Sequence, residues 1–229
     1  MAKNKITRKQ LLKGTDEFLT LSARATIFVR DHSRQFYYLG GAIIALFIIY
    51  LGINAFMDYT HKKGQEAYNK GYYNFAKNLN PSKVDQEVLK KSEELFQQVI
   101  DDYSLSKVSR LAIPQLAYLK FLEKKYGEAI FLYQKFLNNE VSDNSPYQSL
   151  ARIGLAGCYE AKGELKMAME ILNQIMAGPG NFFKEQAMLS LARVYRLTNH
   201  QDKSREILIE FVEKYPSSPF LPTAKAHLK

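Results

Sequence analysis

Residues 149–172, SLARIGLAGCYEAKGELKMAMEIL, contain the pattern that decides the fold. Apolar and small residues recur at intervals of three and four on both sides of Gly163, which is the spacing of an amphipathic helix. Gly163 interrupts the pattern and marks a turn. The stretch therefore predicts two short helices joined by a tight turn, a helical hairpin.

The same pattern returns in phase on both sides of this stretch, in residues 110–137 and 185–216. The small residues Ala129, Ala168 and Ser204, expected in the second helix of each hairpin, lie 39 and 36 positions apart. A degenerate unit precedes them, with a first helix expected over residues 62–77. In that unit the second helix is marked by Ser92, Phe96 and Val99. A recurring unit of this length is typical of a helical solenoid. We expect an all-α domain of about four hairpins, near residues 62–104, 110–143, 149–180 and 185–218. An irregular all-α bundle is the alternative.

The repeated residues resemble the signature of the tetratricopeptide repeat family. They include a large–small pair in the first helix (Leu155–Ala156), a tyrosine after it (Tyr159), a small residue in the second helix and a proline at the exit (Pro216). The resemblance covers about residues 62–222. It departs from the family where a large aromatic residue is expected early in the first helix, at Ile113, Arg152 and Met188. The resemblance implies an α-solenoid whose first helices line a concave surface that holds peptide segments.

An uncharged run of 23 residues, 35–57, precedes the repeats and reads QFYYLGGAIIALFIIYLGINAFM. As a helix it would be about 34 Å long, enough to cross a hydrocarbon core of about 30 Å. We expect a single transmembrane helix over residues 35–58; a buried core helix and a cleaved signal peptide are the alternatives. Residues 1–34 carry eight Lys or Arg against three acids. This excess predicts a cytoplasmic N-terminus, with residues 59–229 across the membrane.

Residues 1–34 have two interpretations. Apolar and basic residues interleave from Phe18 to Arg30, which favours an amphipathic helix along the inner leaflet of the lipid bilayer. A flexible basic tail that only sets the topology is the alternative.

The layout of basic segment, anchor and repeat domain is similar to that of the YfgM-like proteins of the bacterial inner membrane. This similarity implies association with the Sec translocon and with periplasmic chaperones, as a class of partners. We expect a membrane-anchored interaction scaffold with a periplasmic repeat domain that assists protein translocation or envelope protein assembly. A permanently assembled structural subunit of a larger membrane complex is the alternative.

Composition and motifs argue against catalysis. The net charge of +9 divides into +5 before the apolar run and +4 after it, which argues against a nucleic-acid partner. The single Cys158 cannot form an internal disulfide and is expected to be a packed apolar residue. The four histidines do not pair with each other or with Cys158 at metal-ligand spacing. We expect no enzyme activity, no cofactor or metal and no small-molecule substrate.

The candidate site is a groove on the first helices of the repeats. Its expected residues are Tyr118, Phe121, Leu122, Ile153, Glu160, Leu189, Arg193 and Arg196. The groove would be aromatic and apolar at one end and basic at the other, which suits an apolar segment followed by an acidic group. Packing between repeats is the alternative, particularly for Ile153 and Leu189.

Overall fold

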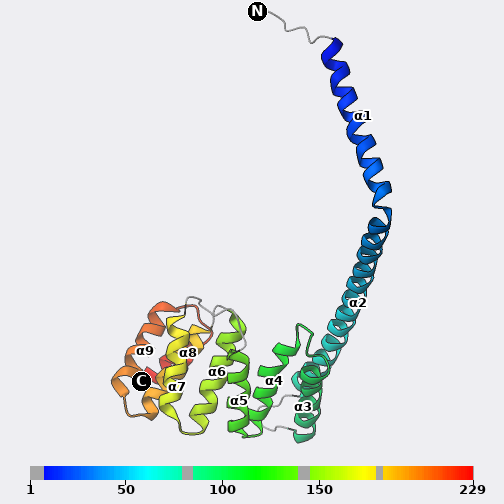
Figure 1. Cartoon of the computed structure of the whole chain (residues 1–229). Coiled ribbons are helices and arrows are strands. Elements are labelled where there is room, and N and C mark those ends of the chain that lie inside the picture. The colour runs from blue at the N-terminus through cyan, green and yellow to red at the C-terminus, as the bar shows by residue number, and fades with distance from the viewer. Residues whose placement is uncertain (1–7, 79–84, 139–144, 179–182, 229) are drawn as a thin grey trace, which may run out of the picture. The chain divides into compact units, whose positions relative to one another are not determined.

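The computed structural model describes residues 8–78, 85–138, 145–178 and 183–228 and, for residues 8–19, the backbone only. All regular secondary structure in these ranges is helical (Figure 1), which confirms the expected fold class. The helices are α1 (Arg8–Asp31), α2 (Ser33–Asn78), α3 (Gln86–Asp101), α4 (Ser109–Leu122), α5 (Tyr126–Asn138), α6 (Pro146–Ala161), α7 (Leu165–Ala177), α8 (Lys184–Leu197), α9 (Gln201–Lys214) and α10 (Leu221–Leu228).

The chain divides into two compact units, Met1–Phe56 and Met57–Lys229. The first unit contains α1 and the N-terminal part of α2, a helix of 46 residues that includes the whole uncharged run. By length and composition α2 can cross a membrane, and its most apolar window is 0% buried against the rest of the described chain. The apolar run is therefore not the core helix of the repeat domain.

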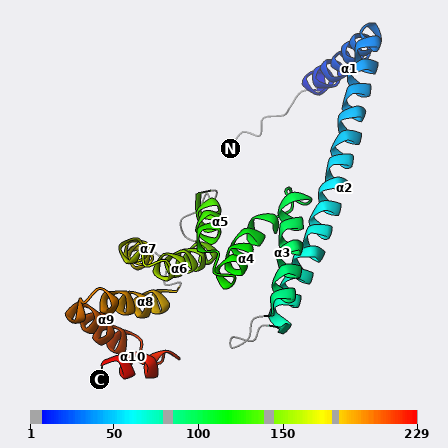
Figure 2. The ribbon, with the colours of Figure 1, turned by 90° about the horizontal axis from the view of Figure 1, so that it is seen from below.

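The second unit is built of hairpins that follow one another in chain order (Figure 2). The turns inside three of them, α4–α5, α6–α7 and α8–α9, each place one residue in the left-handed region: Lys124 (φ 61°), Gly163 (φ 80°) and Asn199 (φ 61°). These residues are 39 and 36 positions apart, the same spacing as the small residues of the second helices. The turns thus repeat in register with the helices. Gly127 lies in the first turn of α5.

Close approach inside each hairpin depends on the small residues that define the repeat. Ala129 and Ala168 are 0% exposed and Ser204 is 4% exposed. The Ser204 hydroxyl donates a hydrogen bond of 2.8 Å to the backbone carbonyl of Ala192 in the partner helix. A polar group is tolerated in this contact because it is satisfied across the hairpin.

The first hairpin pairs the C-terminal part of α2 with α3. Gly71 allows the contact, because a Cβ atom there would lie 3.2 Å from the ring of Phe96. The amide of Asn74 donates a hydrogen bond of 2.9 Å to Ser92, which is fully buried. One helix, α2, thus supplies both the apolar run and the first helix of the repeats.

An ion-pair cluster joins the first two hairpins. The Nζ atom of Lys120 in α4 contacts Glu93 of α3, Glu123 at 3.7 Å and Glu128 of α5 at 3.4 Å. Burial disfavours the charged ammonium group, but the hydrogen bond to Glu93 and the charges of the three carboxylates outweigh it and raise the pKa of Lys120. Lys120 thus remains a cation that holds three helices together.

The last helix, α10, was not anticipated from the sequence. Its Ala224 is fully buried and completes an apolar cluster with Met188, Leu208 and Phe211 of the last hairpin. A solenoid exposes an apolar face at its end unless a further element covers that face. The eight residues of α10 cover it, and they are too few for apolar periodicity to reveal a helix.

Candidate functional site

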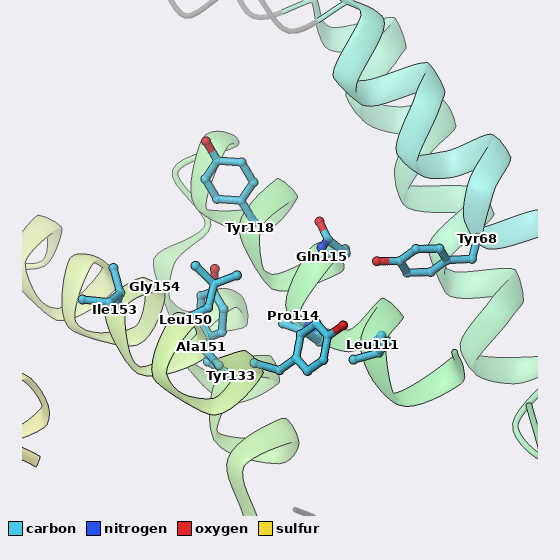
Figure 3. Close-up of a pocket in the computed structure, with 11 residues that line it drawn as sticks. Tyr68, Leu111, Pro114, Gln115, Tyr118, Tyr133, Leu150, Ala151, Ile153 and Gly154 are labelled. Atoms are coloured by element: carbon cyan, nitrogen blue, oxygen red, sulfur yellow. The ribbon is translucent and has the colours of Figure 1, made fainter. Parts of the chain in front are cut away.

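A pocket of about 340 Å³ lies where the first helices of the first three hairpins face one another (Figure 3). Its walls come from α2, α4, α5 and α6, and no Lys, Arg, Asp or Glu lines it. The lining residues are Tyr68, Leu111, Pro114, Gln115, Tyr118, Tyr133, Tyr147, Leu150, Ala151, Ile153 and Gly154. A second pocket of about 160 Å³ shares four of them and continues to Phe121 and Gly157. We call the two pockets together the tyrosine groove.

Tyr133 forms part of the wall between α5 and α6. Its side chain is 5% exposed, and this burial raises the pKa of its hydroxyl group, which stays protonated. The ring packs directly on Gly154: a Cβ atom at that position would lie 2.4 Å from both Cζ and Oη of Tyr133. The absence of a side chain at Gly154 therefore makes this wall possible.

The other two walls are held by aromatic contacts. Tyr68 of α2 packs edge-on against Phe96, with 5.5 Å between ring centroids. Burial raises the pKa of Tyr68, and the amide side chain of Gln115 in α4 opposes the rise. Tyr118 contacts Phe75 edge-on at 5.8 Å. These rings are fixed before any partner arrives.

The rim of the groove is open. Tyr147 is 52% exposed and Leu150 is 47% exposed, and both belong to the first two turns of α6. Tyr118 is 37% exposed on the α4 side. A bound segment would therefore contact aromatic and aliphatic surface on both sides.

Three of the eight residues expected from the sequence line the groove. Tyr118 and Ile153 line the larger pocket, and Phe121 lines the smaller one together with both. Leu122 instead packs against the core of the first two hairpins, and Leu189 against the core of the last one. Neither of these two leucines lines a wall of the groove.

The arginines expected at the basic end of the groove contact other side chains of the repeat domain. Arg193 of α8 makes a two-pronged ion pair with Glu160 of α6: Nε donates to Oε1 at 2.7 Å and Nη2 to Oε2 at 2.9 Å. The hydrogen bond to Glu160 raises the pKa of Arg193. Arg196 contacts the ring of His227 in α10, with 3.1 Å between Nη1 and Nδ1. The sequence placed these groups on one surface but did not reveal that Glu160 already neutralises Arg193.

Sequence reasoning missed Tyr68, Tyr133, Tyr147 and Leu150. Tyr133 was missed because only first helices were projected onto the groove, and Tyr133 lies in a second helix. A signal was present: Tyr133 follows Ala129 by four positions, and the equivalent positions in the next two repeats are Leu172 and Leu208. Tyrosine is longer than leucine and ends in a hydroxyl group. A tyrosine at a position where the other repeats have leucine therefore indicates a side chain that extends past the core.

No metal site accompanies the groove in the part of the chain that the structure describes, where no group of three or more His, Cys, Asp or Glu could hold an ion. Cys158 is fully buried, and burial raises the pKa of its thiol to about 12. The thiol therefore stays protonated and shielded, as a packed apolar residue.

Solved structures with a similar fold are tetratricopeptide repeat proteins. A tetratricopeptide repeat protein from Parabacteroides merdae is 16% identical, with a TM-score of 0.56 over 73% of this chain and 59% of that one. A Podosopora anserina protein with nearly identical repeats, described as a kinesin light chain, is 17% identical, with a TM-score of 0.52 over 75% and 82%. Pseudomonas aeruginosa pilF is 15% identical, with a TM-score of 0.50 over 71% and 66%. At such identities the likeness concerns the fold alone. The chain spans less than two thirds of the first and the last of these structures.

Family models identify the chain more directly. A comparison with curated proteins found no match. A model described as a tetratricopeptide repeat-like domain matches residues 35–187, and a tetratricopeptide repeat model matches residues 186–218. Such repeats generally form protein-interaction scaffolds without enzymatic activity. The chain belongs to the tetratricopeptide repeat-like domain family.

Proposed function

We propose that this protein is a membrane-anchored scaffold that holds an apolar segment of a partner polypeptide in the tyrosine groove. In this proposal the apolar part of α2 crosses the bacterial inner membrane, the N-terminus is cytoplasmic and the repeat domain is periplasmic. The observation that carries the proposal is the groove itself: a pocket of about 340 Å³ with four tyrosines and no charged residue in its lining.

The chemistry of the lining selects the partner. Tyrosine rings provide large, rigid apolar surface, and their hydroxyl groups can hydrogen-bond to a peptide backbone, which is why tyrosine is enriched at the energetic centres of interfaces. A charged side chain would lose its hydration in this pocket without gaining an ionic partner. The groove therefore favours one or two uncharged apolar side chains over an acidic group.

Two observations support the anchor. The most apolar window of α2 is 0% buried against the rest of the described chain, so water is an unfavourable environment for it. The family match begins at residue 35, where the uncharged run begins. The charge excess in residues 1–34 supports a cytoplasmic N-terminus. Substrates in transit through the Sec translocon and periplasmic chaperones are the partner class that fits this placement.

Photocrosslinking in cells tests the groove. A photoreactive phenylalanine analogue at Tyr147, on the rim, should capture partner polypeptides. The same analogue at Tyr73, which is 67% exposed and lines neither pocket, is the matched control. Leu150→Asp should weaken capture at Tyr147 by about tenfold or more, the equivalent of 1.4 kcal/mol, whereas Leu197→Asp should not. Equal capture from Tyr147 and Tyr73, insensitive to Leu150→Asp, would show that binding occurs elsewhere.

A fusion at the C-terminus tests the orientation. A reporter enzyme that is active only in the periplasm, joined after Lys229, should be active. Activity only of a reporter that requires the cytoplasm would contradict the topology and exclude periplasmic partners.

A further inference from the structure

The helix α1, Arg8–Asp31, exposes large apolar side chains. Every described side chain from Thr20 to Arg30 is exposed; Leu21 is 65% exposed, Phe28 57% and Val29 48%. The helix also lies outside the residues that the family models match. An isolated helix is only marginally stable in water, and large apolar side chains on its surface favour an apolar environment.

The apolar side chains share one face. At about 100° per residue, Leu21, Ala25, Phe28 and Val29 fall within an arc of roughly 100°. By the same count Arg24 borders this arc, about 40° from Phe28, whereas Asp31 lies about 60° beyond Phe28 and Arg30 about 100° beyond Val29. Ile27 is the exception, because it is apolar but lies about 160° from Val29, on the charged side.

The apolar face of α1 continues onto the start of α2. His32, the residue between the two helices, packs on Phe28 with 4.4 Å between ring centroids, and its Nδ1 lies 3.0 Å from the Phe28 carbonyl oxygen. Phe28 also meets Phe36 of α2 edge-on at 6.2 Å. Phe36 is the second residue of the uncharged run. The apolar surface of α1 is thus joined through Phe28 to the segment that would lie in lipid.

We propose that α1 is a second membrane contact, which lies in the headgroup region of the cytoplasmic leaflet with the Leu21–Phe28–Val29 face toward the acyl chains. The inference rests on the proposed anchoring of α2. Lipid is favoured over a protein partner because of the continuity through Phe36 and because residues 1–34 carry eight Lys or Arg against three acids. Such an excess is attracted to the anionic cytoplasmic leaflet.

Spin labels on the full-length chain test the orientation of α1. Cys158→Ala removes the native thiol, and single cysteines are then placed at Val29 and at Ile27. This pair is matched, since both are β-branched, they are two residues apart and they are 48% and 51% exposed. Two reference labels set the scale of accessibility: Ile44→Cys in α2 gives the value expected in hydrocarbon, and Glu94→Cys in α3 gives the value expected in water. The protein is reconstituted in vesicles with about 30 mol% anionic phosphatidylglycerol, and the accessibility of each label to oxygen and to a nickel chelate is measured.

The label at Val29 should favour oxygen over the chelate, with a value between those at Glu94 and Ile44, because it lies at the headgroup boundary. The label at Ile27 should resemble the one at Glu94. Replacing the anionic lipid with zwitterionic lipid should reduce this contrast. Equal, water-like values at Val29 and Ile27 with a lipid-like value at Ile44 would refute the role of α1 and leave the anchor intact. A water-like value at Ile44 would refute the anchor itself. Protection of Val29 from both reagents would mean that α1 contacts protein, which also contradicts the proposal.

Discussion

Replacing Gly154 by alanine is the sharpest test of how the tyrosine groove is built. The new Cβ atom would lie 2.4 Å from Cζ and Oη of Tyr133 and 2.9 Å from its Cε1, so the ring must move. The open space beside the ring is the groove, which both residues line. We therefore expect Gly154→Ala to push Tyr133 into the groove and to reduce capture of the partner segment.

The expected cost follows from two opposing effects. Overpacking a buried contact costs about 1–3 kcal/mol, whereas alanine in place of glycine inside a helix gains about 0.5–1 kcal/mol. Gly154→Ala should therefore lower the free energy of unfolding by about 0–2.5 kcal/mol. Gly157, in the same helix, is the matched control, because a Cβ atom there has no neighbour within 4 Å. Gly157→Ala should raise the free energy of unfolding by about 0.5–1 kcal/mol.

Urea unfolding of the compact unit Met57–Lys229, followed by circular dichroism, measures both variants. A double variant with Tyr133→Leu supplies the cross-check, because leucine lacks the two ring carbons, Cζ and Cε1, and the hydroxyl oxygen that collide. The cost of Gly154→Ala should be at least about 1 kcal/mol smaller in that background. If Gly154→Ala were as stabilising as Gly157→Ala, the packing of Tyr133 on Gly154 would be wrong.

Three further outcomes follow from the contacts between helices. Arg193→Glu should destabilise the unit by placing two carboxylates together, and adding Glu160→Arg should restore about 0.5–1 kcal/mol, both measured by urea unfolding. Lys120→Met should cost about 2 kcal/mol, between the values for exposed and buried ion pairs, because partly buried Glu93 loses its counter-charge while Glu123 keeps only Lys125 at 3.0 Å; an unchanged unfolding midpoint would contradict this. The Cys158 thiol should resist maleimide in the folded unit at neutral pH and react after unfolding. Because burial raises its pKa to about 12, the stability that the neutral thiol contributes is present below the pKa of the unfolded state and is lost as the pH rises toward 12.

The sequence by itself determined the helices, their order and their repeat. Spacings of three and four residues predict helices because they place apolar side chains on one face of the same segment. The offsets of 39 and 36 positions between Ala129, Ala168 and Ser204 then gave the phase of three hairpins, and each of these residues is buried in the structure. The sequence alone also predicted a long apolar helix over the uncharged run, because the run consists of 23 consecutive residues without a charge.

Only the tertiary structure decided which side chains meet across helices. Tyr133 and Gly154 are 21 positions apart, and Arg193 and Glu160 are 33 positions apart. Whether such residues touch depends on how far each hairpin is rotated and shifted against the next, which local periodicity does not encode. That stacking limits the candidate site to the aromatic end of the expected groove, because Glu160 neutralises Arg193 at the basic end. The last hairpin also leaves an apolar face at the end of the stack, and the eight residues of α10 pack on that face and bury it.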